Sequence, residues 1–115
     1  MRVKAEIWVK SYIRRCHYNG AYAMVLRRGD SDAGAIFIKI NTLDGQALLM
    51  MPAPAGFSAA DTDRMWIAYN DGQANSEDVV DNYIEKQKKS DPDIWVVEVE
   101  DKDGRMFLEE ETMSI

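Results

Sequence analysis

The chain is poor in the residues from which most catalytic and metal centres are built. Its 115 residues include one cysteine, one histidine and three prolines. One cysteine excludes a disulfide framework and a zinc site with several cysteine ligands, and one histidine excludes most histidine-built centres. No apolar run approaches the roughly 18 residues that a membrane-spanning helix needs. The first ten residues carry Lys4, Glu6 and Lys10 where a signal peptide would be apolar. We therefore expect a cytoplasmic protein with no membrane segment.

The composition is that of an ordinary globular protein, with 46% hydrophobic and 30% charged residues. The length predicts a single domain over residues 1–115, with an acidic tail at 109–115 that frays. The net charge of −6 has the opposite sign from that usual in nucleic-acid binders, so we expect no nucleic-acid partner. The charge is uneven: residues 1–57 have a net charge of +4 and residues 58–115 of −10. These halves either neutralise each other within the fold or pair between subunits.

Two segments have the spacing of helices. In residues 4–17 the apolar residues form one stripe with a period of 3.6: Ala5, Trp8, Val9, Tyr12, Ile13 and Cys16. Asn19 and Gly20 suit the end of that helix, because both tolerate a left-handed backbone. A second helix is predicted over 76–90, with Ser76 as its N-cap, acidic residues in its first turn and lysines in its last.

Strands are predicted where the period falls to two, or where short apolar runs lie between turn residues. The predicted strands are 21–28, 35–41, 46–51, 64–70 and 93–100, with 105–108 as a further short strand. The element order is then α-β-β-β-β-α-β(-β). It predicts an α+β fold whose mostly antiparallel sheet has five or six strands, with both helices packed on one face.

Three motifs together resemble one small bacterial family. They are IWVKSYIRR at 7–15, RRGDSDAGAIFIKIN at 27–41 and DPDIWVVEVEDKDGRMFL at 91–108. The family is domain of unknown function number fourteen ninety-one, found mainly in alphaproteobacteria. The resemblance covers nearly the whole chain and implies a single-domain bacterial protein. It implies no activity, cofactor or site residue.

The segment 27–34 (RRGDSDAG) is the strongest candidate site. A turn framed by two glycines can form an anion nest from its N–H groups, and arginines beside it can clamp a phosphate or carboxylate. The alternative is a structural turn, in which the aspartates make Asx turns and the arginines form ion pairs. The candidate ligand-binding residues are Arg27, Arg28, Asp30, Asp32, Arg14 and Arg15.

A candidate interface with a partner protein lies in the middle of the chain. Met50 and Met51 precede Pro52, and methionines form adaptable apolar surfaces. Trp66 lies on the strand predicted at 64–70. If these three side chains are exposed together, they indicate contact with another protein or a homo-oligomer.

Two other patterns fail on geometry. Cys16 and His17 are neighbours, but adjacent helical residues do not face each other, so they form no catalytic dyad. Asp93, Glu100 and Lys102 follow the order of a metal-dependent nuclease motif. The two carboxylates are seven residues apart on one predicted strand, which separates them by about 23 Å and prevents them from sharing a metal ion.

Acidic residues also gather towards the end of the chain. They are Glu98, Glu100, Asp101, Asp103, Glu109, Glu110 and Glu111. Carboxylates in such a cluster either hold a hard cation or form a solvated edge that discourages contacts between sheets.

The sequence thus predicts no catalytic machinery, no metal and no cofactor. We expect a small non-enzymatic protein-interaction module. A binder of a small anionic ligand, such as a nucleotide or an organic acid held by the 27–34 turn, is the alternative. A metal-dependent hydrolase that uses the acidic cluster is a third hypothesis.

Overall fold

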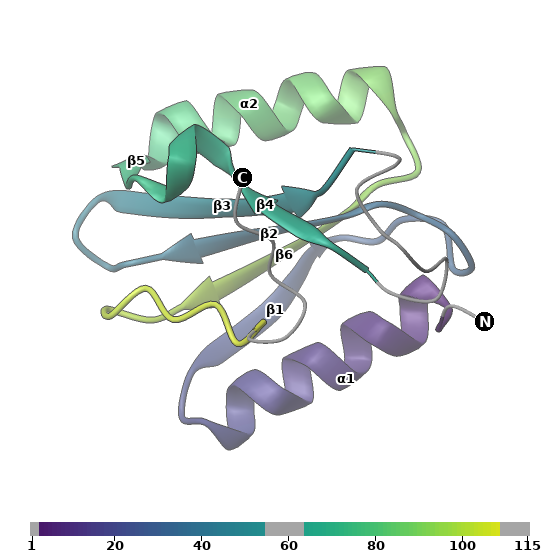
Figure 1. Cartoon of the computed structure of the whole chain (residues 1–115), viewed down its shortest axis with the longest axis horizontal. Coiled ribbons are helices and arrows are strands. Elements are labelled where there is room, and N and C mark those ends of the chain that lie inside the picture. Colours follow the sequence, from purple (N-terminus) through teal and green to yellow (C-terminus); the bar gives the residue numbers. More distant parts are fainter. Residues whose placement is uncertain (1–2, 55–63, 109–115) are drawn as a thin grey trace.

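The protein folds as a six-stranded sheet with a helix on each side (Figure 1). The structure is a computed structural model that describes residues 3–54 and 64–108. Within these residues the elements are α1 (Ala5–Tyr18), β1 (Tyr22–Arg27), β2 (Ile36–Asn41), β3 (Gln46–Pro52), β4 (Trp66–Ala68), the 3-10 turn η1 (Tyr69–Gly72), β5 (Asn75–Ser76), α2 (Glu77–Ser90) and β6 (Trp95–Glu100).

Both predicted helices are present, with the predicted buried stripe in α1 and the predicted N-cap in α2. The buried residues of α1 are Ala5, Val9, Tyr12 and Cys16, all from the predicted stripe. The hydroxyl of Ser76 accepts a hydrogen bond from the N–H of Val79 at 3.4 Å, so it is the N-cap of α2.

The sheet is mostly antiparallel, as predicted, with the strand order β1-β6-β2-β3-β4 and with β5 also paired to β3. β6 is the last strand in the chain but lies between β1 and β2. It is antiparallel to β1 and parallel to β2, and every other strand pair is antiparallel. The inner strands β6 and β2 therefore join distant parts of the sequence.

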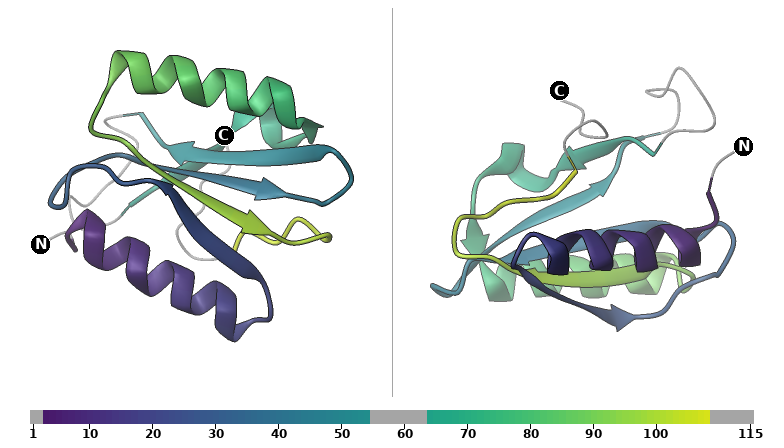
Figure 2. Two further views of the ribbon diagram at one scale, coloured as in Figure 1. Left: turned by 180° about the vertical axis from the view of Figure 1, so that it is seen from behind. Right: turned by 90° about the horizontal axis from the view of Figure 1, so that it is seen from below.

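The expectation that both helices pack on one face is wrong. Along β2, Ile36, Ile38 and Ile40 pack in the cluster that includes the buried side of α1. Phe37, on the other face of the same strand, packs in a second cluster with Val80 of α2. The helices thus cover opposite faces, and Figure 2 shows them on either side of the sheet.

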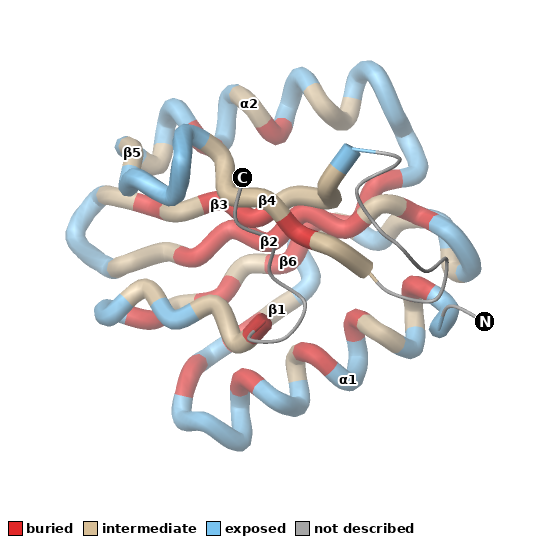
Figure 3. Tube along the Cα trace, viewed as in Figure 1, coloured by how far each residue is buried: buried red, intermediate tan, exposed pale blue. Residues whose placement is uncertain are grey.

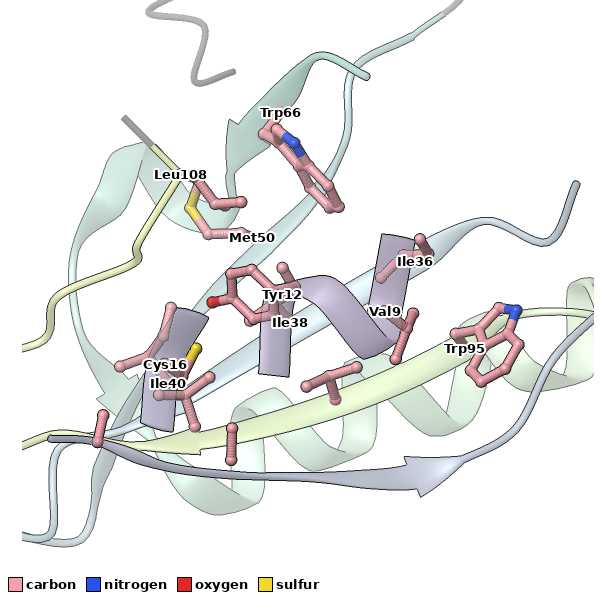
Figure 4. Packing of buried hydrophobic residues seen from close by; sticks show 14 of the residues in the cluster. Val9, Tyr12, Cys16, Ile36, Ile38, Ile40, Met50, Trp66, Trp95 and Leu108 are labelled. Atoms are coloured by element: carbon pink, nitrogen blue, oxygen red, sulfur yellow. The ribbon is translucent and has the colours of Figure 1, made fainter. Parts of the chain in front are cut away.

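The larger core lies between the sheet and α1. The buried positions follow the central strands and the inner side of α1 (Figure 3). The aromatic rings of Trp8 and Tyr12 stack at a centroid distance of 5.0 Å, and Trp66 lies 5.1 Å from Trp8. Figure 4 shows Tyr12 of α1 above Ile38 of β2, so the stripe of the helix fills the space over the isoleucine row.

Two of the predicted strands differ from the structure. β4 covers only Trp66–Ala68, because the chain then turns through η1, where Asn70 and Asp71 have left-handed backbones. Residues 105–108 do not form a strand. The Asp101 carboxylate instead accepts the N–H of Arg105 at 2.7 Å, which turns the chain. The predicted tail at 109–115 lies outside the described residues.

We predict that the core of the α1 side depends on Ile38 far more than on an exposed isoleucine of α1. Ile38 is 0% exposed and Ile7 is 57% exposed. Ile38→Ala should lower the free energy of unfolding by about 2–5 kcal/mol, whereas Ile7→Ala should change it by less than about 0.5 kcal/mol. Urea denaturation of both variants measures this difference, and similar losses in the two would contradict the packing described here.

Candidate functional site

The 29–34 loop, which contains Asp30 and Asp32 of the predicted ligand site, joins the start of α1 to the start of β6. The N–H groups of Ala5 and Glu6 donate to the carbonyl oxygens of Asp32 and Ser31 at 3.1 and 3.0 Å. The first turn of a helix has N–H groups without partners in the helix. The loop therefore caps α1 with its own backbone.

Asp30 organises this loop from within. Its carboxylate accepts the N–H groups of Asp32 at 3.2 Å and Ala33 at 2.8 Å, which is an Asx turn. Its carbonyl oxygen accepts the indole N–H of Trp95 at 2.7 Å, and its own N–H donates to the carbonyl oxygen of Asp93 at 2.9 Å. The Asp30 carboxylate therefore already binds the N–H groups of Asp32 and Ala33, which an anion nest in this loop would need for its ligand.

The two glycines of the loop are needed for close approach. A Cβ atom on Gly29 or on Gly34 would overlap the carbonyl oxygen of Asp93. The loop thus lies directly against the chain that enters β6, with no room for a side chain at either position.

The four predicted arginines do not converge on one point. Arg27 donates from Nη2 to the carbonyl oxygen of Pro92 at 2.6 Å. Arg28 lies over the Trp95 ring, 5.2 Å from its centroid, and its Nη2 is 2.8 Å from Glu6 Oε1. The hydrogen bonds from Arg28 and then Lys10 hold the pKa of the Glu6 carboxyl below its usual value.

Arg14 and Arg15 lie near the other end of α1. Arg15 donates from Nη1 to the carbonyl oxygen of Phe107 at 2.6 Å. About nine residues of helix, or roughly 13 Å, separate this pair from the end of α1 that the 29–34 loop caps. Asp32 faces that capped end, where its carboxylate is 3.7 Å from Lys4 Nζ. The structure thus brings Arg27, Arg28, Asp30 and Asp32 to one corner and places Arg14 and Arg15 elsewhere.

The side chains of the predicted partner interface point inwards. Met50 and Trp66 are each 1% exposed and belong to the α1-side core. Met51 is half-buried, and its sulfur accepts the Tyr83 hydroxyl at 3.5 Å on the α2 side. These three residues therefore pack against the protein's own helices.

The exposed apolar surface lies instead at the corner between α1 and β1. Its members are Tyr18, Tyr22, Val25 and Leu26, here called the β1 patch. Tyr18 is 91% exposed and Tyr22 is 56% exposed, while Ala21 and Ala23 are buried. The sequence signal for this surface is the alternation of sizes in Ala-Tyr-Ala at 21–23, in which the small residues face the core and the large one faces solvent.

The outer edge of β1 is protected against pairing with another strand. His17 Nε2 lies 3.1 Å from the carbonyl oxygen and 3.3 Å from the amide nitrogen of Ala23, so the imidazole covers part of that edge. The register with β6 shifts between Val25 and Arg27, which makes Leu26 the extra residue of a β-bulge. The His17 contacts and the β-bulge at Leu26 both hinder the addition of another strand to β1.

Lys39 is the most deeply buried charge on the α2 side of the sheet. It is 3% exposed, and its Nζ lies 2.9 Å from Glu77, 2.9 Å from Asp81 and 3.3 Å from Glu98. Desolvation is the largest single influence and lowers the pKa of Lys39. The hydrogen bonds to Asp81 and Glu77 and the charge of Glu98 together outweigh it, so the pKa lies above its usual value.

The remaining titratable groups of interest are held by structural contacts. Asp101 is 7% exposed and pairs with Arg105 at 2.9 Å, and the hydrogen bond from Arg105 lowers the pKa of Asp101. Burial raises the pKa of the Cys16 thiol. Residues 3–54 and 64–108 contain no cluster of three side chains suited to a metal ion, and Glu109, Glu110 and Glu111 lie outside these ranges.

Within the described part of the chain, neither helix has the length and apolar character needed to cross a membrane.

Comparisons with known proteins agree on one family. The sequence model described as "Protein of unknown function (DUF1491)" matches residues 3–109. The crystal structure of a DUF1491 family protein from Caulobacter crescentus CB15 has a TM-score of 0.80 and 40% identity, over 96% of this chain and 99% of that chain. An NMR structure of a DUF1491 family protein from the same organism has a TM-score of 0.78 and 40% identity, over 99% of both chains.

A third structure extends the likeness to another genus. The solution structure of a protein from A. tumefaciens has a TM-score of 0.74 and 33% identity, over 87% of this chain and 86% of that chain. A comparison with curated proteins gave no match. The resemblance carried by the three sequence motifs is therefore confirmed, and the family description assigns no activity.

We predict that Gly29→Ala destabilises the protein, because the new methyl group would overlap the Asp93 carbonyl. The free energy of unfolding should fall by about 1–3 kcal/mol. Asp32→Ala, in the same loop but at an exposed side chain, should change it by less than about 1 kcal/mol. Thermal and urea unfolding of the pair test this, and equal losses would show that the loop is not pressed against Asp93.

We also predict that removing the Lys39 charge loosens α2. Lys39→Met should lower the free energy of unfolding by about 3 kcal/mol, because Glu77, Asp81 and Glu98 then face one another without a cation. Adding Glu98→Leu to that variant should restore part of the loss. A Lys39→Met variant as stable as the native chain in urea denaturation would contradict this role.

Proposed function

The chain belongs to the DUF1491 family of proteins of unknown function, and we propose that it acts as a non-enzymatic protein-interaction module. The observation that carries the proposal is the β1 patch, where Tyr18 at the end of α1 and Tyr22, Val25 and Leu26 of β1 are exposed at one edge of the sheet. The partner that we propose is another protein.

The chemistry of the β1 patch suits an interface. Tyrosine is enriched among the residues that contribute most to binding, because its ring buries a large area while its hydroxyl still finds a polar partner. Tyr22 is also held in place, since its ring stacks on His17 at a centroid distance of 6.1 Å. An ordered exposed ring loses little conformational entropy on binding.

The deeply buried charges support a non-enzymatic role. Lys39 and Asp101 are the buried charged residues of the described chain. Lys39 is paired with carboxylates of α2, and Asp101 is paired with Arg105, four residues further along the chain. Groups held in this way stabilise a fold and are not free to exchange protons with a substrate.

The proposed compartment is the cytoplasm, where the partner would also reside. The chain has a single cysteine, and Cys16 is free and buried. A lone reduced thiol suits a reducing compartment.

Capture of a partner through the β1 patch can be tested with a matched pair of variants. Leu26 is 50% exposed in the patch, and Leu43 is 59% exposed at the tip of the β2–β3 hairpin. Tagged native chain, Leu26→Arg and Leu43→Arg are used to retain proteins from a lysate of the bacterium that encodes the chain. Leu26→Arg should reduce the retained partner by about tenfold or more, because it places a charge in the interface, while Leu43→Arg should retain it as the native chain does.

Two controls make this result decisive. The melting temperatures of both variants should stay close to that of the native chain, since both positions are exposed. Size-exclusion chromatography separates capture of another protein from self-association through the same patch. The proposal fails when no protein is retained in near-stoichiometric amount, or when both leucine variants lose it equally.

A further inference from the structure

One half of the sheet face on the α2 side has no helix over it. Ala23 points into the α1-side core, so its neighbours Tyr22 and Met24 point to the opposite face. The buried cluster beneath α2 contains residues of β2, β3 and β6 but none of β1. Figure 2 shows β1 as the edge strand that lies farthest from α2. Tyr22 is exposed and Met24 is half-buried, and together they form an apolar strip over which no helix of the described chain lies.

The strip is bordered by carboxylates. Tyr22 pairs with Glu100 across the β1–β6 ladder, and Met24 pairs with Glu98. Residues directly opposite in a ladder share a face. We call the surface formed by Tyr22, Met24, Glu98 and Glu100 the open face.

The charge of this region is not balanced by the protein itself. Next to the open face, Glu77 and Asp81 extend from α2 towards Lys39, which also contacts Glu98. Together with Glu100 these groups are four carboxylates, and Lys39 is the one ammonium among them. Arg27 lies at the far end of β1, where it donates to the Pro92 carbonyl. The end of the face near Tyr22 and Glu100 thus carries excess negative charge beside an apolar strip.

We infer that the partner of this module docks on the open face with a segment that alternates cationic and apolar side chains. The inference rests on the proposed function and specifies the partner's chemistry, because Tyr22 belongs to both the β1 patch and the open face. The apolar side chains of the segment pack on Tyr22 and Met24. Its lysines or arginines meet Glu100, because Glu98 is already paired with Lys39. The negative charge of this region attracts cations and repels nucleic acid and anionic lipid.

The direct test is an NMR titration of the full, nitrogen-15-labelled chain. The probe is the blocked peptide Lys-Leu-Lys-Leu-Lys-Leu-Lys, and its counterpart has glutamate in place of each lysine. The lysine peptide should shift the amide signals of β1 and β6 and the side of α2 that carries Asp81, and leave the solvent side of α1 unchanged. Its binding should weaken as the salt concentration rises, because salt screens exposed charges.

Three variants identify the groups that bind. Glu100→Gln should raise the Kd of the lysine peptide about two- to fivefold, which is the effect of losing one exposed ion pair. Tyr22→Ser should raise it at least as much through lost packing. Asp78→Asn makes the same change in net charge as Glu100→Gln, but Asp78 is exposed in the first turn of α2 and has no contact with Lys39, so the Kd should not change. Equal weakening by Glu100→Gln and Asp78→Asn, shifts centred on α1, or equal binding of the glutamate peptide would overturn the inference.

Applying Glu100→Gln to the capture experiment separates this inference from the proposed function. Loss of the natural partner with Leu26→Arg, but full retention with Glu100→Gln at both low and high salt, would overturn the cationic segment and leave the interaction module standing. Weakened retention with Glu100→Gln would support both. Peptide binding at the open face without capture of any protein would overturn the proposed function alone.

Discussion

The burial of one ammonium group determines how the two sides of this sheet are arranged. Lys39 lies in the middle of β2, in the run Ile-Phe-Ile-Lys-Ile, and both faces of that strand are covered. Taking an ammonium group out of water is costly unless carboxylates surround it. Here they come from two elements that are distant in sequence, Glu77 and Asp81 of α2 and Glu98 of β6. The requirement to neutralise Lys39 therefore fixes both the rotation of α2 and the position of β6 beside β2.

A second constraint acts at the opposite end of β6 and links it to α1. The 29–34 loop donates the Asp30 N–H to Asp93 and accepts the Trp95 indole, while its carbonyl oxygens cap the first turn of α1. The glycines let the loop lie against the backbone at Asp93 without side chains between them. One strand thus contributes to the position of both helices: Glu98 holds Lys39, which contacts α2, and the Asp93–Trp95 corner holds the loop that caps α1.

Local signals in the sequence predicted most elements, while the errors arose from contacts between distant residues. The stripe of α1 and the Ser76 cap of α2 depend on neighbouring residues and were predicted correctly. The placement of the helices on opposite faces was not, although a strand with apolar residues on both sides, as in 36–40, indicates two covered faces. Nothing local shows that Arg15 points to Phe107 while Arg28 stacks on Trp95. The sequence prediction therefore added Arg14 and Arg15 of the helix to the four residues of the 27–34 segment, and the structure separates these two from the other four.

The same contacts decide how another molecule can approach. A partner that added a strand to β1 would need backbone groups that His17 already contacts at Ala23, and it would meet the bulge at Leu26. Strand addition depends on a regular row of free N–H and C=O groups, so this edge is a poor template. The face of β1 turned away from α1 has no such protection, because Tyr22 remains exposed and no residue of β1 belongs to the cluster beneath α2. Protection of the edge together with exposure of this one face favours recognition through side chains, and Glu100 of β6 then gives the proposed recognition its preference for cations.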